Sequence, residues 1–105
     1  MSPASELGPN AGLIDVPGSR PALLTPALVV DLDKFEANIE GHARICGAAG
    51  LRMRPHTKTH KCSEIAKRQV AAGAVGVCCA TLHEAEVMIA AGIDGVLITS
   101  PVVGA

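Results

Sequence analysis

Residues 52–62 contain the side chains of this sequence that are best suited to chemistry. They read RMRPHTKTHKC, and six of the eleven are Arg, Lys or His. A lysine that is partly desolvated and close to other cations has a lowered pKa, which favours a Schiff base with a carbonyl cofactor. The same composition is also typical of a solvated basic loop, so the residue types alone leave both interpretations open.

A metal site is a third interpretation of this stretch. His56, His60 and Cys62 are ligand-type residues within seven positions. A zinc site requires three or four ligands with the chain folded around them. The remaining histidines, His42 and His83, are each expected on a helix, so we expect no metal ligands in this chain.

Four strands are predicted around the basic stretch. Apolar runs predict strands at residues 27–30, 74–80 and 95–100, and LRMRPH predicts another at 51–56 that ends near Pro55. RPHTKTHKC thus leaves a strand and precedes a helix. In α/β proteins the carboxyl ends of strands are where chemistry gathers.

Three helices alternate with these strands. They are predicted to start at Asp33, Ser63 and Thr81 and to stop at glycines near positions 47–50, 73 and 92. Thr81 and Glu84 have the spacing of a capping box, and Asp33 and Glu36 have a similar one.

The order of elements predicts an α/β fold with a parallel sheet. The repeat of about 20–25 residues suits a barrel or an open doubly wound sheet. A closed barrel takes roughly 250 residues, whereas this chain has 105. We therefore expect residues 1–25 to be an irregular arm and residues 26–105 to be the start of a longer barrel domain.

The totals exclude several classes of protein. Nine Lys and Arg residues balance ten Asp and Glu residues, which argues against a nucleic-acid or membrane surface. The four cysteines lack disulfide-like spacing, and Cys78 and Cys79 lie in an apolar run where packing explains them. No signal peptide is visible. These features predict a cytoplasmic protein.

Four blocks of the sequence resemble one known family in order and spacing. They are TPALVVDLDKFEANI, LRMRPHTKTHKCSEIAKRQ, GAVGVCCATLHEAEVM and AGIDGVLITSPVVG, and they cover residues 25–104. They resemble the N-terminal part of the D-threonine aldolase and D-serine dehydratase family. These are pyridoxal-phosphate (PLP) enzymes of the alanine-racemase-like fold type.

The resemblance implies a fold and a site. The chain would be the N-terminal portion of a PLP-binding TIM-type (β/α)8 barrel, incomplete, with about four strands and three helices. Lys58, the first lysine of the block, would be the catalytic residue that holds PLP as a Schiff base, and Lys61 would not. The phosphate-binding groups and the residues for a divalent metal would lie downstream of this chain.

The resemblance also implies an activity for the full-length parent. It would be a lyase acting on D-3-hydroxy amino acids, cleaving them to glycine and an aldehyde as a D-threonine aldolase does. A D-serine dehydratase, giving a keto acid and ammonia, uses the same Lys58, so the alternative stays open. Racemisation, a non-enzymatic PLP-binding protein and an inactive fragment are further alternatives, and a homodimer of the full-length form also stays open. His56 and His60 either support the cofactor lysine or form ordinary strand-end hydrogen bonds.

Overall fold

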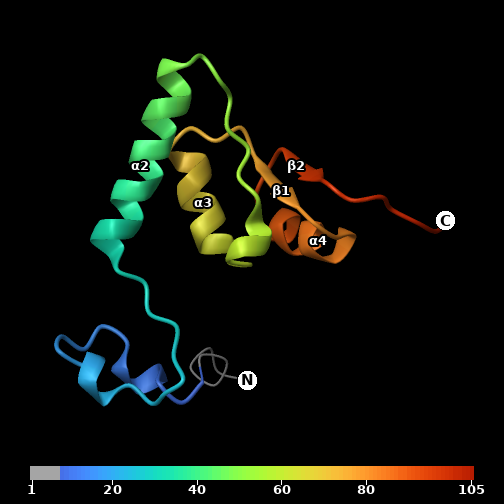
Figure 1. Ribbon diagram of the computed structural model, residues 1–105. Coiled ribbons are helices and arrows are strands. Elements are labelled where there is room, and N and C mark those ends of the chain that lie inside the picture. Colours follow the sequence, from blue (N-terminus) through green and yellow to red (C-terminus); the bar gives the residue numbers. More distant parts are fainter. Residues whose placement is uncertain (1–7) are drawn as a thin grey trace. The chain divides into compact units, whose positions relative to one another are not determined.

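The computed structural model describes residues 8–105, which belong to two compact units that divide after Asp31 (Figure 1). The described part of the first unit, residues 8–31, contains two short 3-10 helices, η1 (Ala11–Leu13) and η2 (Arg20–Ala22). The side-chain amide of Asn10 joins the two ends of the segment from Asn10 to Leu24, which contains both 3-10 helices. It donates to the Leu24 carbonyl at 3.2 Å and accepts from the Leu24 N–H at 2.8 Å.

The strand expected at residues 27–30 is not a strand in the structure. Its side chains are exposed, Leu28 completely so. A strand forms only where its backbone groups pair with a neighbouring chain segment. No described segment pairs with residues 27–30, so the apolar run remains irregular.

The second unit has the three predicted helices and strands at two of the predicted positions. Its elements are α2 (Leu32–Ala48), η3 (Thr57–Thr59), α3 (Ser63–Ala71), β1 (Val77–Cys79), α4 (Leu82–Ala90) and β2 (Val96–Ile98). Figure 1 shows α2 and α3 beside one another and α4 next to the two strands. An α/β unit with three helices and parallel strands is confirmed, and it is a partial sheet rather than a closed barrel.

The sheet is parallel, with β1 in the centre of a three-segment arrangement. On one side β1 pairs with β2, with Cys78 opposite Leu97. On its other side lies the segment predicted as a strand at 51–56. It contributes an isolated parallel bridge between His56 and Cys78, and the Pro55 carbonyl accepts the Cys78 N–H at 2.8 Å. Pro55 has no N–H to donate, which limits this segment to a partial ladder.

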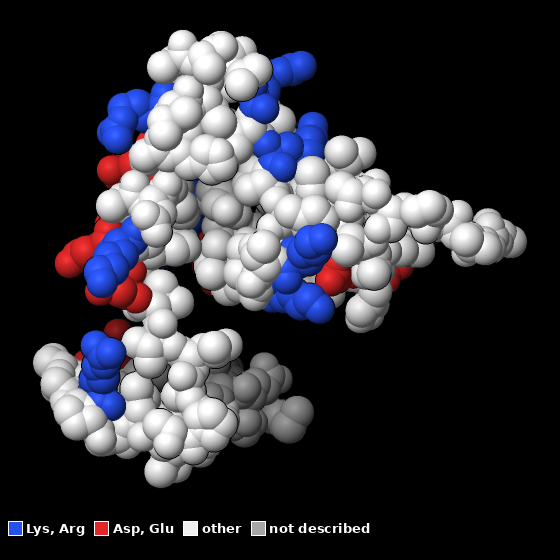
Figure 2. All heavy atoms as spheres, viewed as in Figure 1, with Lys and Arg blue, Asp and Glu red and all other residues white. Residues whose placement is uncertain are grey.

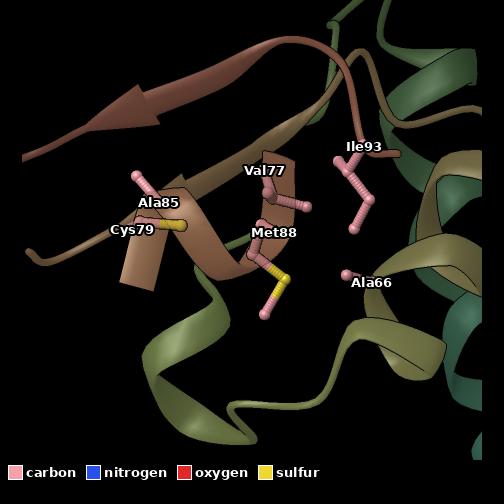
Figure 3. Close-up of a cluster of buried hydrophobic side chains, with 6 residues drawn as sticks. All are labelled: Ala66, Val77, Cys79, Ala85, Met88 and Ile93. Carbon is pink, nitrogen blue, oxygen red and sulfur yellow. The ribbon is translucent and has the colours of Figure 1, made fainter. Parts of the chain in front are cut away.

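One face of the two strands is covered by helices. Val77 and Cys79 point to this face, because alternate residues of a strand share a side. They are completely buried and pack with side chains from α3, α4 and the turn before β2, which are Ala66, Ala85, Met88 and Ile93 (Figure 3). The opposite face is open in this chain, since Leu97 is 51% exposed.

The predicted start of α3 at Ser63 is confirmed, whereas the start at Asp33 and the capping role expected of Ser63 are wrong. Helix α2 begins at Leu32, so Asp33 lies inside its first turn and does not cap it. The residue before α3 is Cys62, without a side-chain cap, and Ser63 is the first helical residue. The capping box of Thr81 and Glu84 at α4 is confirmed in both directions.

A tight crossing of two turns precedes β1 and β2. Gly76 has φ +155° and lies against the backbone of Gly95, whose carbonyl also accepts a hydrogen bond from the Arg54 guanidinium. A Cβ atom on Gly76 would overlap the Gly95 carbonyl. The crossing therefore needs glycine for both its conformation and its space.

We predict that Gly76→Ala destabilises the chain. The backbone conformation alone costs an L residue on the order of 1–3 kcal/mol, and the overlap adds to this. The matched control is Gly47→Ala in α2, which has open space around it and should stabilise the helix by about 0.5–1 kcal/mol. Urea unfolding followed by circular dichroism checks both, and equal midpoints for Gly76→Ala and the parent would contradict the prediction.

Candidate functional site

The basic stretch forms a tight turn at the carboxyl end of the segment that pairs with β1. The N–H groups of His60 and Lys61 both donate to the Thr57 carbonyl, at 3.1 Å and 2.7 Å. Thr57 is 1% exposed and is the buried polar residue among those described. Its hydroxyl donates to the Cys78 carbonyl at 3.1 Å and lies 3.4 Å from the Cys79 sulfur. The side chain of Thr57 therefore attaches the turn to β1.

His56 connects the turn to Thr99, the residue after β2. Its Nδ1 accepts the backbone N–H of Lys58 at 3.2 Å, as the cap of η3. Nδ1 is thus unprotonated, and Nε2 carries the proton that meets the Thr99 hydroxyl at 3.1 Å. The Thr99 hydroxyl in turn donates to the Cys79 carbonyl at 3.3 Å. These hydrogen bonds fix both the imidazole and the backbone of Lys58.

The two lysines of the turn have different surroundings. Lys58 is exposed, and among the described residues its Nζ has no hydrogen-bond or ion-pair partner. Lys61 has a left-handed backbone with φ +49°, and its Nζ lies 3.5 Å from Oε1 of Glu84. Only the first lysine of the block therefore presents an unengaged amine.

Glu84 joins the turn to the start of α4. Its Oε2 accepts the backbone N–H groups of Ala80 at 2.9 Å and Thr81 at 3.2 Å, while Oε1 faces Lys61. The hydrogen bond from the Ala80 N–H is the main cause that lowers the pKa of Glu84, and Lys61 acts in the same direction. Glu84 therefore stays ionised under neutral conditions.

His60 lies on the opposite side of the turn, against α3. Its Nδ1 accepts the Cys62 N–H at 3.0 Å, so its Nε2 carries the proton. Nε2 of His60 and Oε1 of Gln69 are both buried without a partner within hydrogen-bond distance. Burial lowers the pKa of His60, and the neighbouring Gln69 opposes this only in part. The structure gives His60 a supporting place in the turn, with no contact to the Lys58 side chain.

The lowered pKa of His60 predicts a pH dependence of stability. Its pKa in the unfolded chain is 6.5 and lies lower in the folded chain. The contribution of neutral His60 to the free energy of unfolding is therefore complete above pH 6.5. It is lost as the pH falls through the lower pKa of the folded chain.

His60→Asn should abolish this loss, because the Asn carbonyl still accepts the Cys62 N–H but does not titrate. The exposed His83 supplies the control His83→Asn, which should keep the pH dependence of the parent. Unfolding free energies measured in urea across pH 5–8 test this, and an equal slope in His60→Asn and the parent would exclude the His60 contribution.

The structure does not bring the predicted ligand-type residues together as a metal site. Both ring nitrogens of His56 are engaged, and Nδ1 of His60 is taken by Cys62. Within residues 8–105, no group of three His, Cys, Asp or Glu side chains is placed to hold a metal ion.

Two residues of the site were not found by sequence reasoning. Thr99 contacts His56 from 43 positions away, and no local pattern indicates this. Glu84 was recognised as a capping residue, but its contact with Lys61 was not. Its position at the N-terminus of the helix after β1 is the one available signal, since such a carboxylate faces the carboxyl ends of the strands.

The surface gives no single-sign charged patch on the face in view. Figure 2 shows Lys and Arg side chains interspersed with Asp and Glu on a largely uncharged surface. None of the helices in the described part of the chain is long and apolar enough to span a membrane.

Comparison with known proteins gives a consistent result. The sequence profile of the alanine racemase N-terminal domain matches residues 30–103. The chain belongs to this family. Its fold class, a portion of the alanine-racemase-like barrel domain, is thereby confirmed.

The similar proteins have the names of enzymes that act on D-amino acids. D-threonine aldolase of Arthrobacter sp. is 48% identical over 80 residues, which are 76% of this chain and 21% of that protein. The crystal structure of D-threonine aldolase from Filomicrobium marinum superimposes with a TM-score of 0.76 at 56% identity, covering 77% of this chain and 22% of that one.

A dehydratase is similar to nearly the same extent. D-threo-3-hydroxyaspartate dehydratase from Delftia sp. HT23 superimposes with a TM-score of 0.74 at 43% identity, covering 77% of this chain and 21% of that one. A cysteine variant of this dehydratase is described in a metal-free form. The chain thus spans about a fifth of the length of these relatives.

Proposed function

We propose that this chain supplies the N-terminal part of the barrel of a PLP-dependent lyase that cleaves D-3-hydroxy amino acids to glycine and an aldehyde. The full-length protein would carry the activity, with residues 1–25 as an arm and 26–105 as the start of the barrel domain. The observation that carries the proposal is Lys58, an exposed and unengaged lysine held at the strand ends by His56. Its surroundings lie within the region shared with two D-threonine aldolases.

The residues present fit the aldehyde end of PLP. The amine of Lys58 is unpaired among the described residues, whereas that of Lys61 faces Glu84. The backbone of Lys58 is fixed through Nδ1 of His56. Lys58 would therefore hold the cofactor covalently, and His56 would orient Lys58 through the hydrogen bond to its backbone N–H.

PLP, when bound, supplies an electron sink for negative charge that develops at the substrate Cα. Lys58 would be the residue that holds the cofactor, and its Nζ would be available as a proton acceptor when it is not attached. For the dehydratase alternative, which the Delftia relative favours, this Nζ would accept the Cα proton. A metal acting as a Lewis acid on the substrate would be held by residues outside this chain.

The exposed apolar surface supports a longer protein. Helix α2 contains no buried residue, and the side chains of Leu32, Ile45, Leu51 and Leu97 are all more than half exposed. Exposed apolar patches of this kind are normally covered by other elements or partners. A cytoplasmic location and a homodimer of the full-length protein are part of the same proposal, as is a small D-amino acid as the substrate.

Lys58→Ala should abolish covalent attachment of PLP and reduce turnover of D-threonine to background in the full-length protein. Attachment joins Nζ to the aldehyde carbon with loss of one water, and borohydride then fixes the link by adding hydride to the carbon–nitrogen double bond. Peptide mapping after reduction locates the adduct. Lys61→Ala is the matched control and should keep the adduct on Lys58, so an adduct that persists in Lys58→Ala would refute the assignment.

The role of His56 is tested by His56→Ala and His56→Asn. Loss of one cap costs about 1 kcal/mol, so His56→Ala should weaken PLP binding by about fivefold. Asn also caps helices well, and His56→Asn should keep most of the affinity. Titration of the full-length apoprotein with PLP measures both, and an unchanged affinity and turnover in His56→Ala would remove this role.

A further inference from the structure

The backbone of Lys61 adopts a conformation that needs an explanation. Its φ of +49° is uncommon for a residue with a long side chain. The N–H of Lys61 donates to the Thr57 carbonyl at 2.7 Å, which closes the turn around Lys58. Strained residues of this kind persist where surrounding contacts hold them, and they gather at functional sites.

The contact that holds the Lys61 side chain is the carboxylate of Glu84. Glu84 is the better fixed partner, because its side chain is 19% exposed and that of Lys61 is 69% exposed. Its other oxygen is anchored by the N–H groups of Ala80 and Thr81 at the end of β1. The Glu84 carboxylate is therefore held in place by the backbone, and it determines where the Lys61 amine lies.

The ion pair has a consequence for the choice between the two lysines. Lys58 and Lys61 lie three positions apart in the turn that the Thr57 carbonyl closes. An amine held against a carboxylate has to leave it before it can attack a carbonyl carbon, whereas the amine of Lys58 is unengaged. The contact with Glu84 therefore distinguishes the amine of Lys61 from that of Lys58.

We propose that Glu84 is a positioning residue that reserves the cofactor for Lys58 by keeping the amine of Lys61 at the start of α4. This inference rests on the proposed attachment of PLP to Lys58. It adds a residue on a different element, whose helix-capping role alone would not predict any effect on cofactor attachment.

The test compares adducts on the two lysines in the full-length protein after PLP loading and borohydride reduction. Glu84→Gln removes the charge and keeps the capping box, since Gln serves at this position of the box as well. An exposed ion pair has a small effect, so the Lys61 share of the adduct should rise about twofold to fivefold. Glu86→Gln, an exposed carboxylate on the same helix, should leave the Lys61 share unchanged.

A second variant separates competition from a general structural effect. In the double variant Glu84→Gln with Lys61→Gln, the Lys58 adduct should return to the parental yield, because the competing amine is gone. If Glu84 acts only by stabilising α4, the double variant will stay as poor as Glu84→Gln, and the inference is overturned. An unchanged Lys61 share in Glu84→Gln also overturns it.

A measurement without mutation covers the case in which Glu84→Gln fails to fold. Raising the salt concentration screens an exposed ion pair, so the Lys61 share of the parent protein should rise between 20 mM and 1 M NaCl. A constant share would overturn the inference alone. An adduct on neither lysine, or mainly on Lys61 in the parent, would overturn the proposed function as well.

Discussion

The alignment of residues 53–56 beside β1 is the constraint on which the site depends. It consists of one bridge between His56 and Cys78 and of the hydrogen bonds that the Met53 and Pro55 carbonyls accept from Val75 and Cys78. This pairing fixes the position along β1 at which the chain leaves the sheet. Because the turn follows immediately, the position of Lys58 relative to β1 is fixed by these few backbone contacts.

The turn is held by one partner on each side. Thr57 binds β1, His56 binds the residue after β2, His60 lies near Gln69 of α3, and Lys61 faces α4. Three of these partners lie on different elements and the fourth is the residue after β2, and each contact uses a side chain other than that of Lys58. The arrangement holds the backbone of the turn while leaving the amine of Lys58 unengaged, which agrees with the proposed attachment of PLP.

The fold was predictable where local and tertiary preferences agree. Thr81 and Glu84 form a complete capping box, and the apolar runs around Val77 and Leu97 became parallel strands because helices α3 and α4 cover one side of them. The run at residues 27–30 is also apolar, but no segment among residues 8–105 pairs with it, so it is irregular in this chain. Asp33 and Ser63 have cap-forming side chains, yet each lies in the first turn of its helix, since a local sequence pattern places a helix end only to within one or two residues.

The sequence by itself determined the α/β alternation, the family and the lysine-bearing block at a strand end. These follow from local periodicity and from a motif that is contiguous in the chain. Only the tertiary structure decided which groups surround each lysine. The contacts of His56 with Thr99 and of Lys61 with Glu84 join positions far apart in the sequence, and they exist because parallel pairing brings the ends of successive strands and the starts of their helices to one edge of the sheet.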